Sequence, residues 1–130
     1  MLGSLPLMAL VVIAYNVIVF ISGATLETSV FSIALISGAI WTVNVGDIIL
    51  IFGLLLLFIE IINATRTGTL TIVNHGLSML VLLVAVVEFI VLPQFGTSDF
   101  FLIVMLTLLD VIAGFTVTIT SARRDFSVNE

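Results

Sequence analysis

Four apolar runs fill most of this sequence, at about 5–23, 46–63, 71–92 and 99–121, and one long polar segment, Glu60 to His75, separates the second run from the third. A helix of about 20 apolar residues is long enough to span the hydrocarbon core of a bilayer. Hydrophobic residues make up 62% of the chain and charged residues 8%, which is far from the balance of a soluble domain. The sequence therefore predicts an all-α membrane protein, a bundle of four transmembrane helices in a single domain, 1–130.

Charge and residue types exclude several classes of function. The chain carries eight acidic residues and three arginines, so it offers no basic patch for a nucleic acid. It has no cysteine and one histidine, which removes disulfides, thiol chemistry and sites built from several Cys or His ligands. We find no HExxH, GxSxG or glycine-rich phosphate-binding motif. We therefore expect neither an enzyme nor a bound cofactor or metal.

The segment Val30 to Trp41 is apolar but too short to span a bilayer. Ser37-Gly38 stands at its centre between β-branched and aromatic residues, which predicts a β-hairpin over about 30–45. A two-residue turn at Ser37-Gly38 gives three cross-strand pairs: Ala34 with Trp41, Ser32 with Val43, and Val30 with Val45. Both faces are apolar, and a lone hairpin is marginal in water. We expect it to pack on the helix ends, on the membrane surface or on hairpins of other subunits.

The arginines predict the orientation of the bundle. Arg66 lies between the second and third helices, and Arg123 and Arg124 follow the fourth helix in the tail 122–130. With four helices, all three fall on the side of the N-terminus, and arginine-rich loops stay in the cytoplasm. The first apolar run lacks a preceding positive charge and is longer than a signal-peptide core, so we expect it to be retained. Both termini are therefore predicted to be cytoplasmic, with the hairpin outside.

Acidic residues inside the apolar runs are the candidate site residues, because an ionisable group in a bilayer is costly. Glu60 and His75 lie at one depth on neighbouring helices, with Arg66 close by. This predicts a clamp on the cytoplasmic side that holds the two helices together. A proton-entry site is the alternative interpretation.

Glu88 and Asp110 have no cationic residue at their own depth. An unpaired carboxyl group there is expected to be protonated or to hold a cation. Tyr15 and Asn16 of the first helix fall at depths between these two acids. We therefore predict an intramembrane polar cluster of Tyr15, Asn16, Glu88 and Asp110 in the outer half of the bundle. Its expected role is interhelical hydrogen bonding, with a proton or cation site as the alternative.

Small residues and the hairpin predict surfaces for assembly. Gly46, Gly53 and Glu60 recur at intervals of seven and share one line of the second helix, although glycines scattered by chance would explain the spacing equally well. Small residues allow helices to approach closely in lipid. The predicted assembly residues are Phe31, Trp41, Gly53 and Gly114. We expect a structural or accessory subunit, as a homo-oligomer or within a larger membrane complex. The alternative is an oligomeric proton or cation pathway that uses Glu88 and Asp110.

Several short motifs extend over about two thirds of the chain: Gly46-Asp47, Ala64 to Gly68, Glu88-Phe89, Asp110 to Phe115 and Ala122 to Asp125. In these motifs the chain resembles uncharacterised small bacterial four-helix inner-membrane proteins. The resemblance implies a bacterial inner membrane and carries no activity. Four short helices also make the chain similar to the small multidrug resistance transporters, which hold a membrane-embedded Glu in their first helix. The first helix here has Asn16 instead, and its acids lie on later helices.

Overall fold

The computed structural model describes residues 5–23, 25–66 and 68–128, with side chains described as far as residue 124. Over these residues the chain forms four α-helices and one antiparallel hairpin between the first two of them, as predicted. The helices are α1 (Met8–Val17), α2 (Val45–Asn63), α3 (Thr69–Val91) and α4 (Ser98–Val128), and the strands are β1 (Ser29–Ala34) and β2 (Ile40–Asn44). A π-helical segment, η2 (Ile18–Ser22), extends α1, and a 3-10 turn, η3 (Pro93–Phe95), joins α3 to α4.

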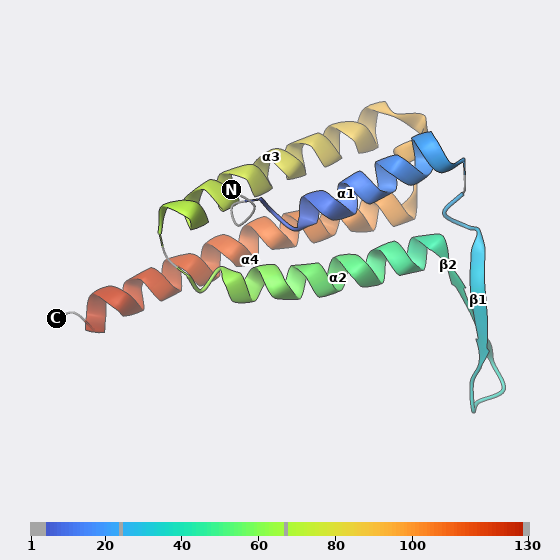
Figure 1. Cartoon of the computed structure of the whole chain (residues 1–130), viewed down its shortest axis with the longest axis horizontal. Helices are drawn as coiled ribbons and strands as arrows, with labels where there is room; N and C mark the ends of the chain where they lie inside the picture. The colour runs from blue at the N-terminus through green and yellow to red at the C-terminus, as the bar shows by residue number, and fades with distance from the viewer. Residues whose placement is uncertain (1–4, 24, 67, 129–130) are drawn as a thin grey trace.

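The four helices lie side by side in one bundle, and the hairpin projects from one end of it (Figure 1). α4 packs against both α2 and α3, and α1 contacts the other three helices. We call the end that carries the strands the hairpin end. The opposite end, where α2 and α4 finish near Arg66, Arg123 and Arg124, is the arginine end.

Local sequence explains where the helices begin and end. The Asp47 carboxylate accepts a hydrogen bond from the Asn44 N–H at 3.0 Å, which stabilises the start of α2. Thr97 Oγ1 accepts from the Phe100 N–H at 3.1 Å and so caps α4. α3 ends before Pro93, which cannot continue a helix. α4 continues to Val128 rather than ending at Ser121 as predicted, because no Gly or Pro interrupts the segment that follows.

The hairpin register differs by one residue from the predicted pairing. The observed cross-strand pairs are Phe31 with Val43, Ser32 with Thr42, Ile33 with Trp41, and Ala34 with Ile40. The Leu35 N–H donates to the Ala39 carbonyl at 2.8 Å, and Gly38 has a φ of 91°. The connection is therefore a three-residue loop with glycine in the left-handed region at its last position. The predicted two-residue turn was wrong because Gly38 closes the loop and does not stand at its centre.

The predicted line of small residues on α2 faces α4 inside the chain. A Cβ atom on Gly46 would lie 2.6 Å from Asp99 Oδ2, and one on Gly53 would lie 2.8 Å from Leu106 Cδ1. Both distances are shorter than van der Waals contact, so the two helices approach this closely only because the side chains are absent. Gly53, predicted as an assembly residue, is therefore occupied by a contact within the chain.

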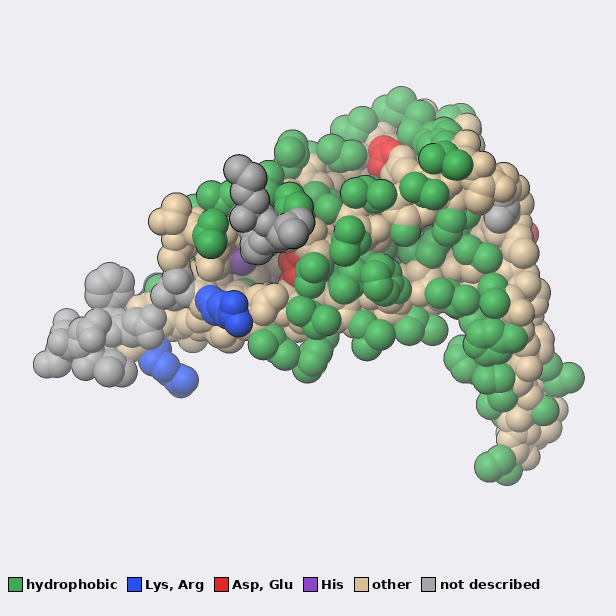
Figure 2. Space-filling view, in the orientation of Figure 1, with side chains coloured by type: hydrophobic (Ala, Val, Ile, Leu, Met, Phe, Trp, Pro, Cys, Tyr) green, Lys and Arg blue, Asp and Glu red, His purple; other side chains and the backbone are tan. Residues whose placement is uncertain are grey.

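Much of the bundle surface is apolar. Among the described residues, three helical segments are long and apolar enough to cross a membrane: Val45–Asn63, Thr69–Val91 and Ser98–Arg124. Only 28%, 17% and 39% of the residues in their most apolar windows are buried inside the bundle. The segment Met8–Ser22 is apolar but shorter. Figure 2 shows hydrophobic side chains spread over the visible face of the helices and along the hairpin.

Candidate functional site

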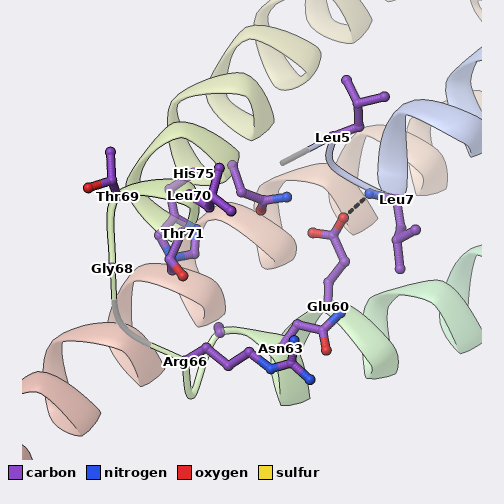
Figure 3. A pocket seen from close by; sticks show the side chains of 12 residues that line it. Leu5, Leu7, Glu60, Asn63, Arg66, Gly68, Thr69, Leu70, Thr71 and His75 are labelled. Carbon is purple, nitrogen blue, oxygen red and sulfur yellow. Dashed lines mark hydrogen bonds between the residues drawn. The ribbon is translucent and has the colours of Figure 1, made fainter. Parts of the chain in front are cut away.

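A pocket of about 510 Å³, with both polar and apolar walls, lies at the arginine end of the bundle. The end of α2, the α2–α3 connection and the first turns of α3 form its walls, and the residues that precede α1 close one side (Figure 3). α1 and η2 together cover about 22 Å at 1.5 Å per residue, which is less than the 19 residues of α2 cover. They therefore do not fill the bundle along its whole length. The pocket is lined by Leu5, Leu7, Glu60, Asn63, Ala64, Arg66, Gly68, Thr69, Leu70, Thr71, Asn74 and His75.

The three residues of the predicted clamp, Glu60, His75 and Arg66, all line this pocket. Glu60 lies in the last turn of α2 and His75 in the second turn of α3, and the short connection between the helices brings the two turns together. Both side chains are buried, with 8% and 5% of their surface exposed. Arg66 is exposed at the rim. The clamp residues thus share one cavity, but Glu60 and His75 each make their hydrogen bond to another group.

Glu60 holds the start of α1. Its Oε1 atom accepts a hydrogen bond from the backbone N–H of Leu7, drawn as the dashed line in Figure 3. The first N–H groups of a helix lack partners within the helix, and the helix dipole makes this end positive. A carboxylate on α2 therefore caps α1. No sequence signal indicated this contact, because the donor is a backbone group that every residue but proline carries.

His75 ties α3 to α4 and to the end of α2. Its Nε2 atom lies 2.7 Å from Thr118 Oγ1, and this hydroxyl donates to the Ala64 carbonyl at 2.7 Å. A hydroxyl has one proton to donate, so the Thr118 oxygen accepts from His75, and Nε2 carries the hydrogen. The imidazole packs on the Phe115 ring, with centroids 4.7 Å apart, and lies over Gly114, where a Cβ atom would be 3.0 Å from Cε1. Sequence analysis missed Thr118, although it follows Gly114 by four residues on one face of α4.

Gly114 was predicted as an assembly residue, and the structure gives it a role inside the chain. Its missing side chain makes room for the His75 ring. Like Gly53, it is buried and unavailable to a second copy.

Asp110 lies deeper in the bundle, against Glu60. Only 4% of its surface is exposed, and it lies against the Glu60 carboxyl group and the Ser78 hydroxyl, which donates its proton to the Asn74 carbonyl at 3.0 Å. If the Asp110 side chain is ionised, its Oδ2 atom is fully buried and has no hydrogen-bond donor among the described residues. The two acids come from α2 and α4. Glu60 lines the pocket, and Asp110 lies behind it in the interior of the bundle.

The four residues of the predicted polar cluster do not lie together. Asn16 Nδ2 donates to Glu88 Oε1 at 3.2 Å, so these two are partners. Tyr15 shares a hydrogen bond of 2.8 Å with Thr97, and Asp110 lies against Glu60. The reason is axial position: Glu88 lies in the last turn of α3 at the hairpin end, whereas Asp110 lies about 18 Å along α4 from that end.

Aromatic side chains fill the bundle at the hairpin end. The rings of Tyr15, Phe95 and Phe100 have none of their surface exposed, and their centroids are 4.6 to 5.0 Å apart. Such tilted and edge-on ring pairs pack favourably. This aromatic plug closes the bundle interior at the end opposite the pocket.

No group of three or more His, Asp or Glu side chains is placed to hold a metal ion within the part of the chain that the structure describes. Comparison with known proteins gives no match: no protein-family model, no curated protein and no solved structure matches the chain. The resemblance to small bacterial inner-membrane proteins therefore stays a prediction, and any function must be argued from the geometry.

Proposed function

We propose that this chain is an integral membrane protein that acts as a structural or accessory subunit, through assembly with its own copies or with other chains. The observation that carries the proposal is the hairpin. The segment Ser29 to Asn44 contains no charged residue and leaves the bundle with apolar side chains exposed on both of its faces. Exposed apolar patches on a protein surface mark sites of contact with proteins or membranes.

The outward apolar surface of the helices supports insertion in a membrane. In water, the large exposed hydrophobic side chains of α2, α3 and α4 would favour aggregation, whereas lipid tails solvate them. Backbone polar groups in these three helices are satisfied within each helix, as a bilayer requires. α1 and η2 together cover about 22 Å, less than the hydrocarbon core, so α1 would rely on its contacts with the other helices.

The arginine end is proposed to face the cytoplasm. Arg66 follows α2, and Arg123 and Arg124 lie in the last two turns of α4. Both helices run away from the hairpin end. Positively charged residues beside transmembrane helices favour the cytoplasmic side. Both termini would then be cytoplasmic and the hairpin external, in the bacterial inner membrane that the sequence resemblance implies.

The two faces of the hairpin would meet different surroundings. Val43 is 1% exposed against the bundle, and Phe31, Ile33 and Trp41 share its face. In a bilayer this face would lie over the membrane surface, where aromatic side chains are favoured.

The opposite face points away from that surface. Ile40 lies on it with 72% of its surface exposed, and Ile36 at the loop is fully exposed. Lipid cannot cover a face that points away from the membrane. This outer face is the proposed docking surface, and a protein partner would bury its apolar side chains.

Single cysteines test the docking surface, because the chain has no cysteine of its own. We expect Ile40→Cys to form disulfide-linked dimers, or a cross-link to a partner, on oxidation in native membranes. Ile90→Cys is the matched control, since Ile90 is 73% exposed in the last turn of α3 and is not part of the hairpin.

A polar outer face should also weaken assembly. Ile40→Asn is expected to lower the oligomeric mass in detergent without changing the emission of Trp41, the single tryptophan, on the other face. A monomeric wild-type protein, or cross-linking no stronger at position 40 than at position 90, would contradict the proposal.

The second candidate is an oligomeric proton or cation pathway. The buried position of Asp110 beside Glu60 and the pocket favours it. Glu88 belongs to a separate pair with Asn16, and the aromatic plug closes the interior of a single chain, so such a path would run between subunits. Proton or cation flux into proteoliposomes, lost in both Glu88→Gln and Asp110→Asn while the oligomer persists, would favour transport over the accessory role.

A further inference from the structure

The contact between Glu60 and Asp110 requires a hydrogen-bond donor that the described residues do not supply. Both groups are more than nine-tenths buried, and they come from α2 and α4. Two carboxylates are both acceptors and repel each other, so neither can satisfy the other. Glu60 Oε1 already accepts from the Leu7 N–H, and Asp110 Oδ2 has no donor among the described residues.

We propose that Glu60 and Asp110 form a carboxyl pair that shares one proton and exchanges it with water through the pocket at the arginine end. A proton on either carboxyl group provides the missing donor and removes the repulsion. The pair then binds its proton as one unit, so the proton belongs to both residues. The inference is independent of the assembly proposal, because its residues lie at the opposite end of the bundle from the hairpin.

α3, the segment before α1 and the α2–α3 connection each place a polar or charged group near the carboxyl pair. α3 places the Ser78 hydroxyl against Asp110, and His75 is within electrostatic range of Glu60. The segment before α1 contributes the Leu7 N–H to Glu60. Arg66, from the α2–α3 connection, lines the same pocket at its exposed rim.

The pocket supplies the route for exchange. Glu60 lines it directly, and a cavity of about 510 Å³ with polar groups in its walls is large enough for several water molecules. On release, the carboxyl O–H bond breaks, the proton passes to a pocket water, and a carboxylate remains on each residue. No other bond changes. The tightly packed plug of Tyr15, Phe95 and Phe100 lies between the pair and the hairpin end, so exchange is assigned to the arginine end.

Proton release would also act on α1. Glu60 is both a member of the pair and the cap of this helix. When both carboxyl groups are charged, their repulsion pushes Glu60 away from Asp110 while its attraction to the start of α1 increases. The position of α1 would therefore respond to the proton.

Infrared spectroscopy of the full-length protein in liposomes tests the pair directly. We expect the wild-type protein to show the carbonyl stretch of a protonated, buried carboxyl group, and we expect this band to shift when the liposomes are transferred to D₂O. Glu60→Gln and Asp110→Asn should each remove the band, because each leaves one carboxylate with an amide donor. Glu88→Gln is the matched control, since Glu88 already accepts from Asn16, and it should keep the band.

Three outcomes would overturn the proposal. The first is a band that persists in Asp110→Asn, and the second is its loss in Glu88→Gln. The third is its loss when Na⁺ is added at constant pH, which would show that the pair holds a metal cation instead.

A second measurement serves if either variant fails to fold. An apolar carbodiimide reacts with protonated carboxyl groups in apolar surroundings, and mass spectrometry of the wild-type protein locates the adduct. We expect the adduct on Glu60 or Asp110, with a yield that falls as the pH rises. Modification of neither residue at any pH would contradict the shared proton.

Discussion

The two ends of this bundle are built in opposite ways. At the hairpin end the interior is closed by tilted and edge-on aromatic rings, and the apolar surface lies outside, on the hairpin. At the arginine end the interior is open, with Glu60 and His75 in a pocket and Arg66 at its rim. The hairpin end is thus suited to contact with other molecules, and the arginine end to the binding of a proton.

The two ends of the bundle also give the acidic residues Glu88 and Glu60 different hydrogen-bonding partners. Glu88, toward the hairpin end, accepts a hydrogen bond from the neutral amide of Asn16. Glu60 meets a second acid, Asp110. A carboxylate with an amide donor is satisfied as it stands, whereas two carboxyl groups in contact require a proton or a cation between them. Glu88 is only partly buried, whereas Glu60 and Asp110 are buried, so both the partner and the burial of these acids differ between the two ends.

The largest loss of stability is expected from a substitution in the aromatic plug. Phe100→Ala removes a fully buried ring and should lower the free energy of unfolding by about 3 to 5 kcal/mol. Phe101→Ala is the matched control, because the neighbouring ring is 46% exposed and its loss should cost far less. Denaturant unfolding in detergent measures both. Equal losses would mean that the hairpin end is not closed by packing.

A smaller change in the free energy of unfolding is expected when either of two glycines, Gly114 and Gly76, is replaced by alanine. Gly114→Ala places a methyl group 3.0 Å from the His75 ring and should destabilise the protein by about 1 to 3 kcal/mol. Gly76→Ala meets no atom within 4 Å and should stabilise α3 by about 0.5 to 1 kcal/mol. Thermal unfolding gives the sign of each change. The imidazole NMR signals of the single histidine should move more in the first variant than in the second.

The smallest effect is expected for the hydrogen bond between His75 and Thr118. Thr118→Val keeps the side-chain shape and removes both bonds of the hydroxyl, which should cost about 0.6 to 2 kcal/mol. In the control, Thr116→Val, the lost hydroxyl is exposed and bonds only within α4, to the Ile112 carbonyl. Its effect should be close to zero. If the two valine variants unfold alike, the link from α3 to α4 contributes nothing measurable.

The sequence predicted the elements of the fold because strong local signals specify them. Apolar runs of transmembrane length indicated α2, α3 and α4, Pro93 ended α3, and Ser37-Gly38 indicated a hairpin. The hairpin register was missed, because one glycine serves equally well in a two-residue or a three-residue loop. Pairing depends on which of these the chain adopts.

The site was predictable only in part. The short connection after α2 places Glu60, His75 and Arg66 together, and this follows from the sequence order alone. The contact of Glu60 with Asp110 and the cap on Leu7 depend on the rotation and depth of α1 and α4, which hydropathy does not specify. For the same reason, sequence analysis grouped Asp110 with Glu88, although they lie at different depths.

The measurement that tests this account most directly is the labelling of single cysteines from each side of the membrane. Thr71→Cys lies in the pocket at the arginine end, and Ser98→Cys is exposed at the hairpin end. In sealed vesicles of known orientation, we expect a membrane-impermeant thiol reagent to reach Thr71→Cys from the cytoplasmic side alone and Ser98→Cys from the external side alone. Labelling of both from the same side, or of Thr71→Cys from the external side, would contradict a bundle that spans the membrane with its open end toward the cytoplasm.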